Sequence, residues 1–216
     1  NILETGQGLR GWGNFMMDLV ENRSFAEDLM DKMVETHLDN LKKFLRAAGD
    51  NVDVIFMGDD LGTQNATQIS PEMYHELLYP RHKKIYRYVR ENSSACVLLH
   101  SCGSITPLLP DLIDAGIQAL NPVQTSAANM EPHMLKDRFG DRLTFWGGGC
   151  DTQTVLPDGT PQEVEEHVRG QVSIFAPGGG FVFCPVHNVQ AGVRPRNIVT
   201  MLETFAACRY YPISVT

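Results

Sequence analysis

The segment VLLHSCGS, residues 97–104, joins a short apolar run to a polar end that contains glycine. Short, near-continuous apolar runs are typical of strands that are buried on both faces, as in a parallel sheet covered by helices. In an extended segment, side chains two residues apart point to the same face, so we expect His100 and Cys102 to project together. The segment therefore predicts a buried strand whose end presents both side chains to one cavity.

An imidazole nitrogen and a thiolate that lie a few ångströms apart suit a borderline-soft metal such as zinc. The alternative is a hydrogen-bonded histidine beside a buried, inert thiol. The pair His100 and Cys102 by itself leaves both interpretations open.

The same pattern of an apolar run with a polar end recurs along the chain. The other runs are DVIFMGDD (53–60), IQALNPV (117–123), LTFWGGGC (143–150) and FVFCPVHN (181–188). Amphipathic segments with helix signals lie between them, including capping boxes and prolines at the first helical position. The signals that we use are Ser24 with Glu27 for a helix to about Ala48, Ser70-Pro71-Glu72, Thr160-Pro161 with Glu163, and the segments Leu108–Ala115 and Arg196–Ala207.

Five successive βα units predict a parallel α/β sheet or part of a (β/α)8 barrel. Five strands do not close such a barrel, which has eight. An open sheet of this composition would expose an edge strand of buried type. We therefore expect residues 1–216 to be the C-terminal portion of a single barrel domain whose first strands lie outside this sequence.

The loops that follow the strands carry glutamine at comparable positions. Ligands bind at the carboxyl ends of strands in α/β proteins, and an amide both donates and accepts hydrogen bonds. A single glutamine would more simply cap its loop, but four at equivalent positions predict a site for a polar ligand with several oxygens. These residues are Gln64, Gln124, Gln153 and Gln190.

Composition narrows the class of protein. Hydrophobic residues make up 43% of the 216, which is enough for a sizeable core, and the formal net charge of −8 argues against binding to nucleic acid. No apolar run approaches the roughly 18–20 residues of a membrane helix, and the first residues do not have the pattern of a signal peptide. Five cysteines without framework spacing favour a reducing compartment, so we expect a soluble, cytoplasmic protein.

Taken together, the strand ends and their flanks resemble the uroporphyrinogen decarboxylase superfamily over essentially the whole chain. This resemblance implies a (β/α)8 barrel with its site at the carboxyl ends of the strands. It rests on LRGWGNFMMDLVENRSFAEDLMDKM, GDDLGTQNATQISPEMYHELLYPRHKKIY, HSCGSITPLLPDLIDAGIQALNPVQ, FGDRLTFWGGGCDTQTVLPDGTPQEV and HNVQAGVRPRNIVTMLE.

The resemblance implies one of two activities. One branch of the superfamily removes acetate carboxyls from a tetrapyrrole without a cofactor, using residues that would lie before Asn1. The other comprises cobalamin-dependent methyltransferases that hold zinc on a His-x-Cys pair, which His100 and Cys102 match, and on a third ligand near the last strand. In that branch the third ligand precedes a P-x-N-I segment by a roughly constant interval. The same interval counted back from PRNI (195–198) of this chain implies His187, with Cys184 as the alternative.

The methyltransferase branch implies further roles. Asp60 could complete the zinc shell, orient His100 or act as an acid or base, unless it only caps its loop. We expect Asp60, His100 and Cys102 to carry the chemistry. The expected contacts to substrate or corrinoid are Asp59, Gln64, Asn121, Gln124, Asp151, Gln153 and Gln190.

The leading hypothesis is a zinc-dependent enzyme that moves a methyl group between a small substrate or thiol and a corrinoid, and we expect the corrinoid to be carried on a partner protein. A cofactor-free decarboxylase of the uroporphyrinogen type is the alternative, and a tetrapyrrole or corrinoid binder without catalysis is a third hypothesis. A homodimer is a further expectation from the resemblance.

Overall fold

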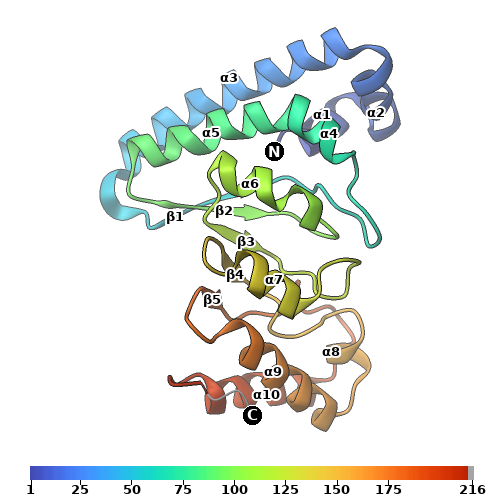
Figure 1. The fold of residues 1–216 in the computed structure, drawn as a ribbon, viewed down its shortest axis with the longest axis vertical. Coiled ribbons are helices and arrows are strands. Elements are labelled where there is room, and N and C mark those ends of the chain that lie inside the picture. The colour runs from blue at the N-terminus through green and yellow to red at the C-terminus, as the bar shows by residue number, and fades with distance from the viewer. Residues whose placement is uncertain (214–216) are drawn as a thin grey trace. The chain divides into compact units, whose positions relative to one another are not determined.

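The computed structural model describes residues 1–213, which form an α/β fold with a parallel sheet (Figure 1). The strands follow one another in the sheet in the order of the sequence, as expected for repeated right-handed βα units. They are β1 (Val54–Gly58), β2 (Cys96–His100), β3 (Ala119–Asn121), β4 (Thr144–Trp146) and β5 (Phe181–Val182). The predicted strands are thus confirmed, but each is shorter than its apolar run, and the polar ends of the runs lie in loops.

Helices occupy most of the segments between the strands. The α-helices are α1 (Leu3–Arg10), α2 (Trp12–Glu21), α3 (Arg23–Ala48), α4 (Pro71–Met73), α5 (Tyr79–Asn92), α6 (Leu109–Ala115), α7 (Pro132–Phe139), α8 (Val155–Asp158), α9 (Pro161–Phe175) and α10 (Pro195–Cys208). Short helical turns are η1 (Gly49–Asn51), η2 (Tyr74–Leu78, a π-helical turn) and η3 (Thr106–Leu108). No helix within residues 1–213 is both long and apolar enough to cross a membrane.

Two of the predicted helix starts are confirmed and one is wrong. Thr160 accepts the N–H of Glu163, whose carboxylate accepts the N–H of Thr160 in return, which completes a capping box. Ser70 accepts the N–H of Met73 in the same way. Ser24, however, lies inside α3, which begins at Arg23 and has no side-chain cap. The side chain of Arg23 binds Glu27 instead, so the pattern that predicted a box is part of an ion pair along the helix.

The chain forms two compact units. The first comprises residues 1–62, 67–101 and 107–118, and includes β1, β2 and the helices α1 to α6. In this unit Val54 pairs with Cys96 and Gly58 with His100, and α3 and α5 run side by side (Figure 1). The pairing register places Gly58, Asp59 and Asp60 beside the end of β2.

The second unit comprises residues 63–66, 102–106 and the described residues from 119 to 213. Strand β4 pairs with β3 and with β5, and α9 packs against α10. The ladder continues beyond β5, because Gly149 donates to the carbonyl of Cys184 and Val186 donates to that of Cys150. Its core is aliphatic, and the buried members are Cys150, Leu156, Val164, Val168, Val172, Ala176, Val193 and Met201.

Candidate metal centre

The loop after β2 turns at Gly103. The apolar part of β2 is buried from Val97 to Leu99 and ends at the half-buried His100. Ser101 is buried, and its hydroxyl accepts the N–H of Leu61. Gly103 has a φ of 86°, a left-handed conformation that is easy only for glycine, so the chain reverses immediately after Cys102.

In the second unit, this turn brings Cys102 close to His187. The Sγ atom of Cys102 and a ring nitrogen of His187 lie within 4.8 Å of each other. His100 ends β2 two residues before Cys102, and its ring offers the third donor atom of the same group. Cys102 and His100 are half-buried and His187 is exposed, so these side chains can be reached from solvent.

The strand ladder explains why His187, and not Cys184, is part of this group. Pro185 pairs with Cys150, and the buried Val186 donates its N–H to the Cys150 carbonyl just before His187. Cys184 lies three residues earlier, with its thiol 4.0 Å from the side-chain nitrogen of Asn121. Burial raises the pKa of the Cys184 thiol, which disfavours the thiolate that a metal ligand requires.

Asp59 is a buried structural residue. Contrary to our expectation, its side chain is not open to a ligand at the carboxyl end of the sheet. Its carboxylate accepts hydrogen bonds from the N–H groups of Ile2, Leu3 and Glu4, at 2.8–3.0 Å. It also accepts one from His82, whose Nε2 lies 3.0 Å from Oδ2. Asp59 therefore supplies the acceptor for the unpaired N–H groups at the start of α1, and its negative charge faces the positive end of the helix dipole. The residue at the cap position, Ile2, has no side-chain oxygen that could do this. The expected substrate contact does not fit this fully enclosed carboxylate.

The hydrogen bonds at Asp59 determine its ionisation. Burial by itself would raise the pKa of this carboxyl, but the hydrogen bond and charge of His82, with the bonds from the α1 backbone, lower it below its ordinary value. His82 is itself held, since its Nδ1 lies 3.0 Å from the Tyr74 hydroxyl. Desolvation raises the pKa of Tyr74 well above 10, so this hydroxyl keeps its proton.

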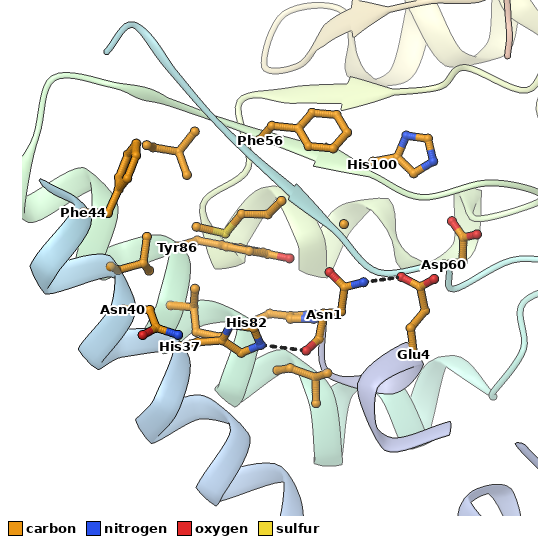
Figure 2. A pocket seen from close by; sticks show the side chains of 16 residues that line it. Asn1, Glu4, His37, Asn40, Phe44, Phe56, Asp60, His82, Tyr86 and His100 are labelled. Carbon is orange, nitrogen blue, oxygen red and sulfur yellow. Dashed lines mark hydrogen bonds between the residues drawn. The ribbon is translucent and has the colours of Figure 1, made fainter. Parts of the chain in front are cut away.

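Asp60 is half-buried and lines a cavity of about 550 Å³ in the first unit, together with His100 (Figure 2). The apolar side of this cavity comes from β1 and α3, with Phe56 and Phe44 as its largest exposed side chains. The Phe56 ring lies 5.7 Å from that of His100. Sequence reasoning identified Asp60 and His100 here but missed the two phenylalanines, because an apolar residue in a strand or a helix is ordinarily part of the core.

The polar side of the cavity begins at the first residue. Asn1 donates to the Glu4 carboxylate at 2.8 Å, and its carbonyl lies 2.9 Å from Nε2 of His37 (Figure 2). Burial raises the pKa of Glu4, with a smaller contribution from the charge of Asp60. Burial also lowers the pKa of His37. Both shifts favour the neutral forms of these side chains.

Three of the four predicted glutamines come together in the second unit. Gln124 and Gln153 both donate to the side-chain oxygen of Gln64, at 2.9 and 3.2 Å. Gln124 also accepts the N–H of Gly103 at 2.8 Å. Gln190 is exposed, and its side-chain nitrogen lies 3.4 Å from the carbonyl of Asn188. Of the four glutamines at comparable loop positions, Gln64, Gln124 and Gln153 therefore lie together and hydrogen-bond one another.

Asp151 caps a helix, and Asn121 braces two strands. The Asp151 carboxylate accepts the N–H groups of Gln153, Thr154 and Val155 as well as the Thr154 hydroxyl. Although burial opposes ionisation, these bonds keep the pKa of Asp151 below its ordinary value. Its expected contact with substrate does not fit, because Asp151 is buried and its oxygens are occupied by the start of α8. Asn121 donates to the carbonyl of Trp146 at 2.9 Å.

Comparisons with known proteins identify a family and several relatives of this chain. Residues 2–208 match the uroporphyrinogen decarboxylase (URO-D) family. The methylcobamide:CoM methyltransferase MtaA of Methanosarcina barkeri is 25% identical over 201 residues, which are 88% of this chain and 57% of the relative. A methylated-thiol–coenzyme M methyltransferase of Methanosarcina mazei is 25% identical over 146 residues, which are 65% of this chain and 36% of the relative.

The fold is also found in a solved structure. A methyltransferase from Methanosarcina mazei superposes with a TM-score of 0.75, over 97% of this chain and 57% of the other, at 17% sequence identity. The expected α/β fold of the barrel class is therefore confirmed, and the chain spans 57% of the length of the MtaA relative. Because the family match covers almost every residue, this chain belongs to the uroporphyrinogen decarboxylase (URO-D) family.

Proposed function

We propose that this chain carries a zinc site formed by His100, Cys102 and His187, and that the protein uses it to move a methyl group between a thiol or small methylated compound and a corrinoid. The observation that carries the proposal is the proximity of these donor atoms at the carboxyl end of the sheet. The similarity to proteins named methylcobamide:CoM and methylated-thiol–coenzyme M methyltransferases supports methyl transfer over decarboxylation.

The donor set fits zinc. With zinc–nitrogen and zinc–sulfur bonds of tetrahedral geometry, ligand atoms lie about 3.5 Å apart. Donor atoms within 4.8 Å of one another reach that spacing through small side-chain rotations. Two imidazoles and one thiolate leave the fourth position open, which is the pattern of catalytic rather than structural zinc sites.

Bound zinc would act as a Lewis acid and would keep an incoming thiol as its thiolate near neutral pH. The two cysteines near this site differ in how readily they become thiolates. Cys102 must lose its proton when metal binds, whereas neighbouring Cys184 keeps its own because burial raises its pKa. The Phe56 ring lies beside His100, with the two ring centres 5.7 Å apart.

Asp60 is our candidate for proton transfer or for orienting His100. Both residues line the same cavity in the first unit, and Asp60 is half-buried there (Figure 2). The fully enclosed Asp59 next to it is not a candidate. We propose a corrinoid carried by a partner protein as the second substrate, and the similarity to a protein named methylcobamide:CoM methyltransferase supports this proposal.

The test is the zinc content of anaerobically purified protein, compared among Cys102→Ser, His187→Ala and Cys184→Ser variants. Near-stoichiometric zinc that is lost in the first two variants and retained in the third is the expected result. The Cys184→Ser variant is a matched control, because it removes a half-buried thiol three residues from His187. Methylation of a thiol by methylcobalamin should fall with the zinc content.

Two results would contradict the proposal. Zinc that persists without both Cys102 and His187 would show that the metal binds elsewhere. Folded wild-type protein without zinc would exclude the metal site, and decarboxylation of a porphyrinogen by that protein would favour the other branch of the family.

A further inference from the structure

The backbone next to Cys102 is held by a side chain from another loop. Gly103 donates its N–H to the Gln124 side-chain oxygen at 2.8 Å. We propose that Gln124 is a positioning residue for Cys102, acting through the Gly103 amide, and that Gln64 and Gln153 fix its orientation. This inference rests on the proposed zinc site, since it assigns the glutamines to placing one of its ligands.

The contact acts on Cys102 because of its position in the peptide chain. The N–H of Gly103 belongs to the peptide unit that also contains the carbonyl of Cys102, and a peptide unit is planar. The Gln124 bond therefore fixes the plane on one side of the Cys102 Cα atom. Gly103 has a φ of 86° and no side chain, so steric contacts of its own restrain this turn only weakly.

Gln124 is in turn prevented from rotating. Its amide nitrogen donates to the Gln64 oxygen at 2.9 Å, and Gln153 donates to the same oxygen at 3.2 Å. Gln64 donates to the carbonyl of Ser126 at 2.6 Å, and the Ser126 hydroxyl donates to the Gln153 oxygen at 2.8 Å. Flipping the Gln64 amide would turn its NH₂ group toward two donors, so the bonds define one orientation.

The network joins loops that are far apart in sequence. Gln64, Gln124 and Gln153 follow β1, β3 and β4, respectively. A backbone bond from Ser104 to the carbonyl of Thr63, at 2.8 Å, joins the Cys102 loop to the Gln64 loop as well. Hydrogen-bonded side chains of this kind cooperate, so the loss of one member loosens the others.

Removal of the Gln124 amide should therefore weaken metal binding without removing a ligand. Without this acceptor, the Gly103 peptide can rotate and carry Cys102 away from the His187 nitrogen. Loss of a partner that orients a metal ligand typically weakens metal affinity by about 10–100-fold. We expect an effect of at least about 10-fold for Gln124→Leu.

The experiment measures zinc affinity by competition with a chromophoric chelator in wild-type protein and three variants. Gln124→Leu removes the acceptor, and Gln124→Glu keeps an acceptor for Gly103. Gln118→Leu is the matched control, because Gln118 accepts the N–H of Val97 at 3.2 Å, near the opposite end of β2. The thiolate-to-metal charge-transfer band of cobalt-substituted protein reports the geometry at Cys102 independently of activity.

Weaker zinc binding and an altered charge-transfer band in Gln124→Leu, with an affinity near wild type in Gln118→Leu, would support the inference. Gln124→Glu keeps the acceptor for Gly103 but loses the donor to Gln64, so we expect a smaller loss in this variant than in Gln124→Leu. Equal affinity and an equal band in wild type and Gln124→Leu would overturn it, and so would an equal loss in Gln118→Leu. Wild-type protein that binds no zinc would overturn the proposed function, and this inference with it. The wild-type measurement thus separates the two failures.

Discussion

Removal of the Asp59 carboxylate should destabilise the protein more than the loss of an ordinary ion pair. In Asp59→Ala, three N–H groups at the start of α1 and the buried imidazole of His82 lose their acceptor. Removing one partner from a buried ion pair costs about 3–5 kcal/mol, and Asp59 with His82 is a buried pair of this kind, so we expect a loss of about 4 kcal/mol in the free energy of unfolding.

Asp59→Asn gives a sharper test, because it keeps the shape of the side chain. An amide oxygen at the Oδ2 position would still accept from Ile2, Leu3 and His82. The amide nitrogen would then face the N–H of Glu4, which leaves one buried donor unsatisfied. An unsatisfied buried donor costs about 1–3 kcal/mol, so we expect a loss of about 2 kcal/mol.

Urea unfolding at pH 7, followed by circular dichroism, measures these losses. Glu91→Gln is the control, because Glu91 is exposed and pairs with the exposed Arg87 at 3.0 Å on the surface. Such a surface pair contributes less than about 1 kcal/mol. A loss in Asp59→Ala no larger than that of the control would refute the reasoning, and so would a larger loss in Asp59→Asn than in Asp59→Ala.

The pH dependence provides a second check on Asp59. Its pKa is lower in the folded protein than its ordinary value of 3.8, so the ionised form stabilises the fold above that value. This contribution is lost as the pH falls below 3.8 and through the folded pKa. The free energy of unfolding should therefore decrease less steeply with acid in Asp59→Asn than in wild type. Parallel acid profiles of the two proteins would contradict the assignment.

Two further predictions concern the second unit and an exposed thiol. Burial, with a smaller contribution from the charge of Asp151, raises the pKa of Cys150 to about 12. Iodoacetamide at pH 8 should therefore label the exposed Cys96 and leave Cys150 unmodified until the protein unfolds. Equal labelling rates of the two cysteines in peptide mapping by mass spectrometry would contradict this. Asn197 is fully buried and donates to the carbonyls of Leu156 and Gly159, at 2.9 and 2.8 Å. Asn197→Ala should cost about 2 kcal/mol and lower Tm by about 4–8 °C in calorimetry, and an unchanged Tm would show that these bonds contribute little.

The fold could be predicted from the sequence because its signals are local. Apolar runs with polar ends predicted each strand, and Thr160 with Glu163 predicted the start of α9, since these patterns act within a few residues. Ser24 with Glu27 shows the limit of such signals. Glu27 lies three residues after Ser24, as a capping box requires, but it pairs with Arg23, four residues before it, because α3 already begins at Arg23.

The candidate site could be predicted only in part. Two residues along an extended chain bring His100 and Cys102 to one face, so this pair follows from backbone geometry alone. Contacts across long stretches of sequence decided the rest. Packing placed His187 beside Cys102, enclosed Asp59 under α1, and joined Gln124 to Gln64, which are 60 residues apart.

By itself, the sequence determined the α/β class, the order of its elements and the His-x-Cys pair, because each depends on periodicity and steric preferences over a few residues. Only the tertiary structure decided which polar groups hydrogen-bond to other parts of the chain and which stay accessible to a ligand. Asp59, Asp151 and the three glutamines were all plausible ligand contacts in sequence, yet each is bound to other parts of the chain. The reason is that buried hydrogen-bonding groups must find partners, and long-range packing alone determines where those partners lie.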